Sequence, residues 1–143
     1  MRIKTGSASE TEAAGAELAG RLGPGDVVVV AGELGAGKTT FVRGACRGLG
    51  VSQPVTSPTF TIGQLYRGAA RGRPLEVAHL DLYRLEAVGA LGAEEAGLLD
   101  DYLTPERVAF IEWPRAGEAV LAVATIRVGL EHRGGDRRLL EVS

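Results

Sequence analysis

The residues best suited to chemistry lie in one glycine-rich stretch that ends in Lys-Thr. The spacing of a Walker A phosphate-binding loop is met by Gly32, Gly37, Lys38 and Thr39. Glycines let the backbone curl so that successive N–H groups surround an anion, a lysine brings charge to the β- and γ-phosphates, and a threonine hydroxyl can ligate Mg²⁺. We therefore expect nucleotide phosphates to be held by the whole loop: Glu33, Leu34, Gly35, Ala36, Gly37, Lys38, Thr39 and Thr40.

A strand and a helix must hold this loop in place. Val27 to Val30 are four consecutive valines, a run typical of a fully buried strand. Thr39 to about Leu49 is predicted to be a helix whose positive N-terminal end faces the phosphates, with Gly50 as its C-terminal stop. The alternative is a glycine-rich turn without a ligand, and the flanking strand and helix argue against it.

Two carboxylates compete for a metal beside this loop. Glu112 follows four apolar residues and precedes an abrupt stop at Pro114, the form of a Walker B strand that sets its acid near Mg²⁺. Asp81 ends a second internal strand, predicted from Leu75 to Leu82. We favour Glu112 because its strand is more continuously apolar; for either acid, the alternative is a carboxylate that satisfies backbone groups. His79 alternates with Asp81 on one strand face, so it either orients that acid or is a structural histidine.

The chain from Val51 to Phe60 is predicted to be an extended, polar loop. It holds two prolines and five hydroxyl or amide side chains, a composition that excludes a helix. A loop after the first helix of a phosphate-binding fold is well placed to present the Thr59 hydroxyl to the γ-phosphate and metal, as switch segments do. A simple connector is the alternative.

The segments before the loop are predicted to extend and cover the sheet. Arg2 to Thr5 is predicted to be a short edge strand. Ser9 to Glu12 has the pattern of a capping box at the start of a helix, and Gly23 to Asp26 is predicted to turn the chain into the valine strand.

The remaining segments are predicted to form strands and short helices. Thr59 to Tyr66 is predicted to be a strand, and Tyr66 to Pro74 a hairpin-type connection. The three arginines of that connection indicate either a solvated turn or contact with a phosphate backbone. Leu85 to Leu103 is predicted to form short helices, and a terminal hairpin pairs Ala122 to Glu131 with Arg137 to Val142.

Length and composition restrict the class of protein. A chain of 143 residues fits one domain, and its net charge of −2 argues against a mainly electrostatic nucleic-acid binder. Cys46 is the only cysteine, which excludes an internal disulfide and favours a packing role. No apolar run approaches the length of about 18 residues that spans a membrane, and there is no apolar leader, so we expect a cytoplasmic protein.

These elements predict an α/β chain with a single nucleotide-binding domain over residues 1–143. The expected architecture is a three-layer P-loop NTPase fold with a mixed, mostly parallel sheet flanked by helices and a C-terminal β-hairpin.

Four motifs resemble the signatures of the TsaE (YjeE) family in their order and spacing. They are residues 32–40, 57–60, 79–84 and 111–114, and the resemblance covers about residues 25 to 115. Members of that family are bacterial ATPases that help build threonylcarbamoyladenosine in tRNA together with the TsaB and TsaD proteins. The resemblance implies this activity and these partners for the chain, with tRNA contacted indirectly or weakly.

The resemblance also implies a role for each site residue. ATP and Mg²⁺ would be bound with Lys38 and Thr39 at the phosphates and Glu112 at the metal. Thr59 and Asp81 would have switch-like or water-ordering roles. The chain departs from the family pattern at two positions, Glu33, where Asp is common, and Arg115, where an acid often follows Trp-Pro.

Two other classes of nucleotide-binding protein are alternatives. A small-molecule kinase needs an acceptor pocket and usually an arginine-bearing lid, and no segment is long enough for both. A module that senses ATP without hydrolysing it needs fewer polar groups than Thr59, Asp81 and Glu112 supply. No Asn-Lys-x-Asp sequence supports guanine specificity. Because little of the chain remains for a lid, we expect slow hydrolysis that a partner protein accelerates.

Overall fold

The computed structural model describes residues 1–33, 35–56, 63–81, 101–113 and 124–143. Leu34, Thr59, Arg115 and most of the predicted short helices between Leu85 and Leu103 lie outside these ranges. The described elements are β1 (Arg2–Thr5), α1 (Ala8–Ala19), β2 (Val27–Ala31), α2 (Lys38–Gly48), β3 (Gly63–Ala70), β4 (Arg73–Asp81), β5 (Arg107–Trp113), β6 (Ile126–His132) and β7 (Arg138–Val142).

The described strands form one mixed sheet in the order β1-β7-β6-β2-β5-β4-β3. β2 lies in the middle, parallel to β6 on one side and to β5 on the other, and β4 is parallel to β5. The other three pairings, β1 with β7, β6 with β7 and β3 with β4, are antiparallel. The expectation of a mostly parallel sheet was therefore wrong, because strands joined by short turns can only pair antiparallel and two such hairpins flank the parallel centre.

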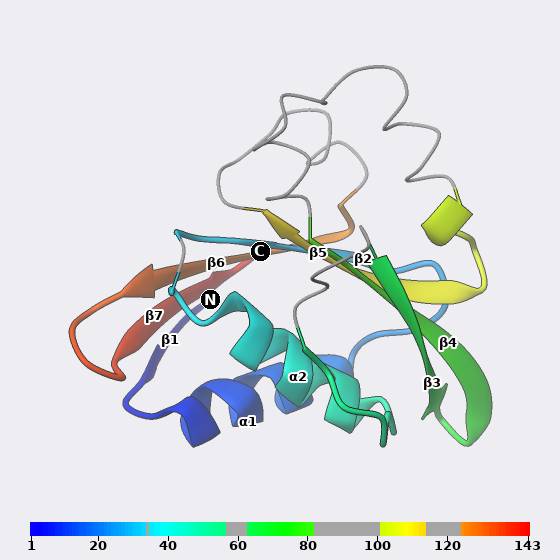
Figure 1. Ribbon diagram of the computed structural model, residues 1–143, viewed down its shortest axis with the longest axis horizontal. Coiled ribbons are helices and arrows are strands. Elements are labelled where there is room, and N and C mark those ends of the chain that lie inside the picture. The colour runs from blue at the N-terminus through cyan, green and yellow to red at the C-terminus, as the bar shows by residue number, and fades with distance from the viewer. Residues whose placement is uncertain (34, 57–62, 82–100, 114–123) are drawn as a thin grey trace, which may run out of the picture.

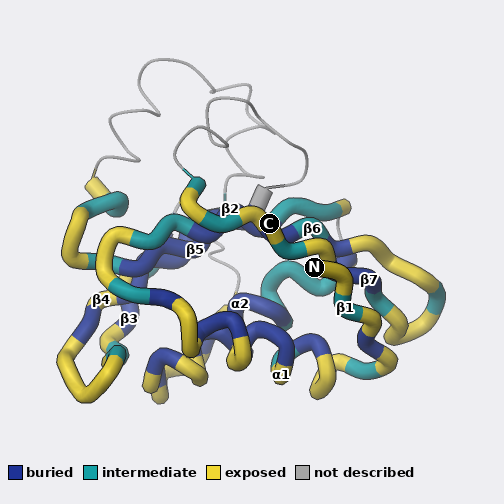
Figure 2. The backbone as a smooth tube through the Cα atoms, turned by 180° about the vertical axis from the view of Figure 1, so that it is seen from behind, coloured by how far each residue is buried: buried dark blue, intermediate teal, exposed yellow. Residues whose placement is uncertain are grey.

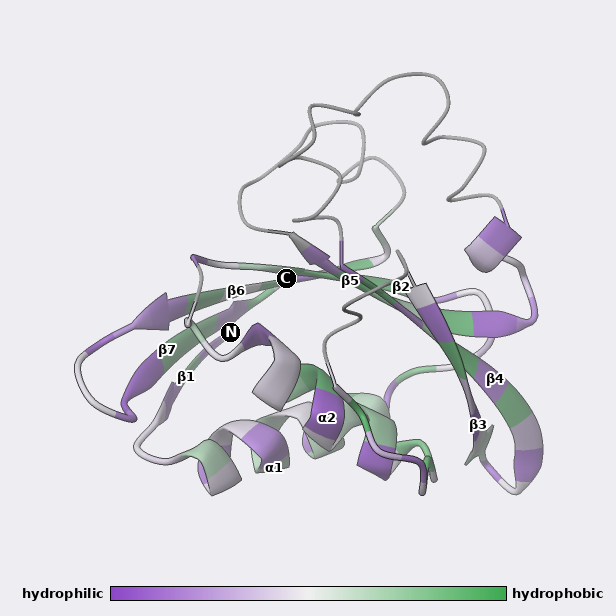
Figure 3. Cartoon of the chain, in the orientation of Figure 1, coloured by the Kyte–Doolittle hydropathy of each residue, from purple (hydrophilic) through white to green (hydrophobic). Residues whose placement is uncertain are grey.

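Both described helices, α1 and α2, lie on the same face of the sheet (Figure 1). Phe41 and Val42 of α2 and Phe110 of β5 are fully buried in the core between these layers. The helices cross so closely that a Cβ on Gly44 would lie 1.9 Å from the Glu12 carbonyl oxygen, which requires glycine there. The buried residues follow the central strands and the sheet-facing sides of the helices (Figure 2), and the hydrophobic residues follow the same central strands (Figure 3).

The capping box of α1 begins two residues earlier than predicted. Ser7 is the N-cap: its hydroxyl oxygen accepts from the Glu10 N–H at 3.2 Å, and a Glu10 carboxylate oxygen accepts from the Gly6 N–H at 3.0 Å. Glu12 instead forms ion pairs with Arg43 at 3.5 Å and Arg47 at 2.9 Å, both on α2. Both serines fit the sequence pattern, and the contact between the helices decides between them.

The hairpins confirm the predicted strand pairing but move its boundaries. β3 continues to Ala70 and β4 starts at Arg73, so a tight turn of Arg71 and Gly72, both at positive φ, replaces the predicted connection from Tyr66 to Pro74. The predicted edge strand is β1, and the predicted terminal hairpin is β6 and β7. Within the described ranges, neither helix is long and apolar enough to cross a membrane.

Candidate nucleotide-binding site

The phosphate loop connects the central strand β2 to the start of α2, as predicted. Gly35 and Gly37 have φ values of 82° and 95°, in the left-handed region that glycine adopts without strain. Gly37 is the N-cap of α2, and no side chain caps the helix there. The N-terminal end of α2 favours an anion, because the helix dipole is positive there.

Lys38 lies across its own loop. Its ammonium donates hydrogen bonds to the Gly32 carbonyl at 2.7 Å and the Glu33 carbonyl at 2.9 Å. Burial lowers the pKa of Lys38, while the nearby carboxylates of Glu112 and Asp81 oppose that shift. The fold thus brings the predicted lysine and both predicted acids into one electrostatic environment.

Glu112 lies on β5 directly beside the strand that delivers the loop. It pairs in register with Val30 of β2, is 2% exposed, and accepts hydrogen bonds from the Thr39 hydroxyl at 2.8 and 3.1 Å. Asp81 pairs in register with Glu112 from β4 and is less deeply buried. Both acids therefore stand at the same edge of the sheet, and Glu112 contacts the loop threonine.

His79 contacts Glu112 and not Asp81. The interpretation that His79 orients Asp81 is therefore wrong. Its Nε2 contacts the Glu112 carboxylate, and its Nδ1 lies 3.3 Å from the Tyr66 hydroxyl. The reason is the sheet order: β4 lies between β3, which carries Tyr66, and β5, which carries Glu112. The imidazole, which is fully buried, spans that space.

Tyr66 and the partly buried Gln64 of β3 complete this polar chain and were not predicted. The Tyr66 hydroxyl donates to the Gln64 side-chain oxygen at 2.6 Å and lies 3.3 Å from His79 Nδ1. A proton on His79 Nε2 can be donated to the Glu112 carboxylate. Burial is the main cause that raises the pKa of Tyr66 to about 12, which keeps the phenol protonated at neutral pH. Alternation on β3 gives no hint of this network, which depends on strand register.

The residues at this edge fit a magnesium ion. The Thr39 hydroxyl and the Glu112 carboxylate are hard oxygen ligands, and Mg²⁺ commonly takes one or two protein ligands together with water and phosphate oxygens. In the described part of the chain, no group of three or more His, Cys, Asp or Glu side chains could hold a metal alone. A Mg²⁺ ion at this edge would be held by Thr39 and Glu112 together with water and the phosphate oxygens of a nucleotide.

Arg138 of β7 donates hydrogen bonds to the phosphate loop, and the sequence pattern did not predict this contact. Its Nε donates to the Ala36 carbonyl and its Nη2 to the Gly35 carbonyl, each at 3.1 Å. A third nitrogen, Nη1, donates to the Gly135 carbonyl at 2.7 Å in the hairpin turn. The guanidinium therefore links the phosphate loop to the C-terminal hairpin, a contact across about 100 residues that no local pattern indicates.

The family model and the similar proteins point to the same family. The model of the family described as threonylcarbamoyl adenosine biosynthesis protein TsaE matches residues 5–140. The TsaE protein of Bacillus subtilis is 36% identical over 138 residues, covering 96% of this chain and 82% of that protein. The TsaE protein of Treponema pallidum is 34% identical over 146 residues and covers both chains fully.

A solved structure has a similar fold over nearly the whole chain. The crystal structure of YdiB from Bacillus subtilis superposes with a TM-score of 0.71 at 31% identity, covering 98% of this chain and 82% of that one. The family match spans nearly the whole chain, including every residue that forms the phosphate loop and its acid. The chain belongs to the TsaE family of threonylcarbamoyladenosine biosynthesis proteins.

Proposed function

We propose that this chain is a Mg²⁺-dependent ATPase that acts in the threonylcarbamoyladenosine modification of tRNA, together with TsaB and TsaD. The observation that carries the ATPase part is the hydrogen bond between Thr39, at the end of the phosphate loop, and the buried Glu112. Hydrolases of this class bring a loop hydroxyl and a strand-end acid together around one metal ion. The tRNA part is supported by the family and by relatives named as tRNA threonylcarbamoyladenosine biosynthesis proteins.

Each side chain then has a task. The loop N–H groups and Lys38 bind the β- and γ-phosphates, and Thr39 and Glu112 would hold Mg²⁺, which when bound neutralises phosphate charge. His79 fixes the orientation of Glu112 from behind. Asp81, next to Glu112 in register, would orient a water molecule, and Thr59 would supply a further hydroxyl from the predicted switch-like loop.

The contacts of Arg138 support a partner requirement. This arginine lies beside the loop, but it directs its guanidinium to carbonyls of the loop and of the hairpin turn. Phosphoryl transfer is accelerated by about 10³ to 10⁵ when an arginine is supplied to the γ-phosphate, often from a second protein. We expect TsaB and TsaD to supply that charge or to order the Thr59 segment.

The test is ATP hydrolysis by the purified chain, alone and with TsaB and TsaD. We expect slow release of inorganic phosphate that the partners accelerate, and no acceleration for Lys38→Ala. Rapid hydrolysis that the partners leave unchanged would overturn the partner requirement. A small-molecule kinase would instead move the γ-phosphate to an added acceptor, and a sensing module would bind ATP without hydrolysis in every mixture.

A further inference from the structure

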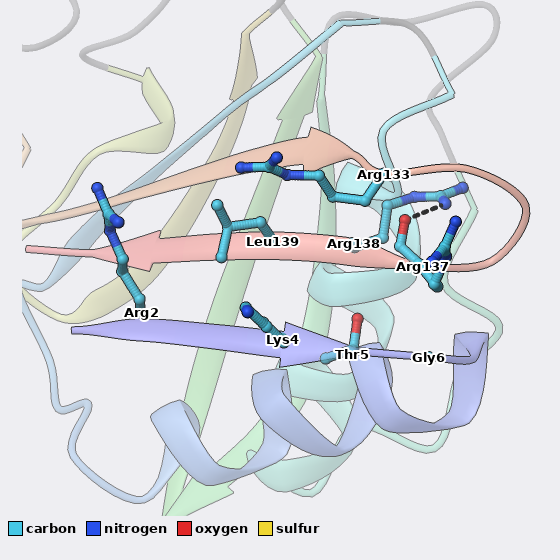
Figure 4. Close-up of a pocket in the computed structure, with 8 residues that line it drawn as sticks. All are labelled: Arg2, Lys4, Thr5, Gly6, Arg133, Arg137, Arg138 and Leu139. Carbon is cyan, nitrogen blue, oxygen red and sulfur yellow. Dashed lines mark hydrogen bonds between the residues drawn. The ribbon is translucent and has the colours of Figure 1, made fainter.

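The end of the sheet beside the phosphate loop carries a basic groove of about 830 Å³. Five cationic side chains line it and no carboxylate does: Arg2, Lys4, Arg133, Arg137 and Arg138. Figure 4 shows these side chains gathered over β1, β7 and the turn between β6 and β7. This concentration is notable in a chain with 16 basic and 18 acidic residues.

The strand register explains how the groove forms. Lys4 and Arg2 on β1 pair with Leu139 and Glu141 on β7, so these four residues share one face of the sheet. The neighbouring residue Leu140 is fully buried in the core under the helices, so the shared face points away from α1 and α2. Leu139 is only 6% exposed on that outer face.

Two of the five cations have carboxylate neighbours, but these ion pairs are weak. Arg2 contacts Glu141 at 3.1 Å and Arg133 contacts Glu131 at 3.3 Å. The arginine side chains are 76% and 53% exposed, and exposed pairs of this kind contribute about 0–1 kcal/mol. A polyanion can therefore replace these carboxylates as the partner of Arg2 and Arg133 at a small cost in free energy.

The lining indicates what kind of partner the groove fits. It contains no aromatic ring and one apolar side chain, Leu139, which is already buried. Protein interfaces depend on apolar and aromatic anchors at their centre, and the exposed large hydrophobics of the described residues, Met1 and Leu65, do not line the groove. Cations without stacking rings suit the repeated phosphates of a nucleic-acid backbone, read without regard to sequence.

We propose that this groove binds the phosphate backbone of RNA, and that tRNA is the RNA it meets. The choice of tRNA rests on the proposed function, whereas the groove and its charge do not. Arg138 both lines the groove and holds the Gly35 and Ala36 carbonyls, so bound RNA lies directly beside the phosphate loop. The groove lies at the β1 edge of the sheet, whereas the arginines near the β3–β4 turn, for which the sequence analysis considered a phosphate contact, lie at the opposite edge.

The experiment is fluorescence anisotropy of a labelled, unmodified tRNA transcript with three forms of the chain. These are the wild type, the groove variant Lys4→Gln with Arg137→Gln, and the control Arg71→Gln with Arg73→Gln at the far end of the sheet. Each double variant removes two exposed positive charges. ATP affinity, measured in the same proteins, checks that each variant is folded.

We expect micromolar binding of the wild type at low salt, with log K falling against log salt at a slope of about −3 for four exposed cations. The groove variant should bind at least about tenfold more weakly with a slope near half that value, and the control should bind within about twofold of the wild type. Equal weakening in both double variants, or no binding by the wild type, would overturn the assignment.

One further outcome is decisive. If the groove variant keeps wild-type affinity for tRNA but loses affinity for TsaB and TsaD, the groove is a protein-docking surface and the RNA assignment is wrong. The hydrolysis assay of the proposed function uses neither double variant, so failure of the ATPase proposal would be seen there. RNA affinity and its salt dependence test the groove by themselves.

Discussion

The Thr39 hydroxyl donates a 2.8 Å hydrogen bond to a carboxylate oxygen of Glu112, 73 positions further along the chain. Thr39 stands at the start of α2 and Glu112 near the end of β5, so this bond joins the phosphate loop to the neighbouring strand. The two side chains of this contact are the ones that we propose as Mg²⁺ ligands.

Lys38→Ala should weaken ATP binding by about 2 kcal/mol or more, because it removes a partly desolvated charge from the phosphates. Titration calorimetry measures the affinity. Lys4→Ala, at the other lysine of the chain, is the matched control and should bind ATP normally. Unchanged affinity in Lys38→Ala would mean that the loop is not the nucleotide site.

Glu112→Gln and Asp81→Asn should have different effects on hydrolysis. If Glu112 holds the metal, its amide variant should raise the Mg²⁺ concentration for half-maximal rate. Asp81→Asn should mainly lower the rate at saturating Mg²⁺, because Asp81 would orient water. Rates measured across a Mg²⁺ titration separate these patterns, and the opposite result would exchange the two roles.

Tyr66→Phe should loosen His79 and, through it, Glu112. The change keeps the buried ring but leaves His79 Nδ1 without its hydroxyl partner, at a cost of about 1–3 kcal/mol in the free energy of unfolding. Urea unfolding measures this loss. Tyr102→Phe, whose ring packs with the core of the opposite sheet face, should leave the Mg²⁺ dependence of hydrolysis unchanged.

The Mg²⁺ titration gives a second readout for Tyr66. A role limited to packing would lower stability in Tyr66→Phe without moving the half-saturating Mg²⁺ concentration. A positioning role through His79 raises that concentration, and His79→Gln should raise it less than His79→Ala, because an amide can still donate to Glu112.

Arg138→Ala should weaken ATP binding by about tenfold. The arginine donates to the Gly35 and Ala36 carbonyls, and without it the loop has more conformations to lose when phosphate binds. Arg138→Lys should recover only part of the affinity, because an ammonium lacks the planar fork of donors. Arg133→Ala, which lies in the same hairpin but makes no contact with these carbonyls among its described bonds, should bind ATP like the wild type.

Alkaline pH should destabilise the fold partly through Cys46. Burial is the main cause that raises the pKa of this thiol from 9.0 to about 12, so the folded state holds its proton after the unfolded state has lost it. The stabilisation is complete below pH 9 and is lost as pH rises from 9 towards 12. In urea unfolding at several pH values, Cys46→Ala should show a shallower decline over this window than the wild type.

The sequence by itself determined the parts of the site that are built from neighbouring residues. The loop from Gly32 to Thr40 combines a buried strand, glycines with positive φ and a helix start, and all three depend on local backbone preferences. The same holds for Glu112, because an apolar run that ends in an acid needs no partner to be recognised as a buried strand end.

Only the tertiary structure decided which side chains meet across strands. Tyr66, His79 and Glu112 come from three adjacent strands, and Arg138 reaches the phosphate loop from the last strand of the chain. Strand order and register set these contacts, and both result from packing of the whole chain, so residue types and spacing do not contain them. Ser7 rather than Ser9 caps α1, because Glu12 forms ion pairs with the arginines of α2. The two serines have the same local pattern, so the sequence near them does not distinguish the cap.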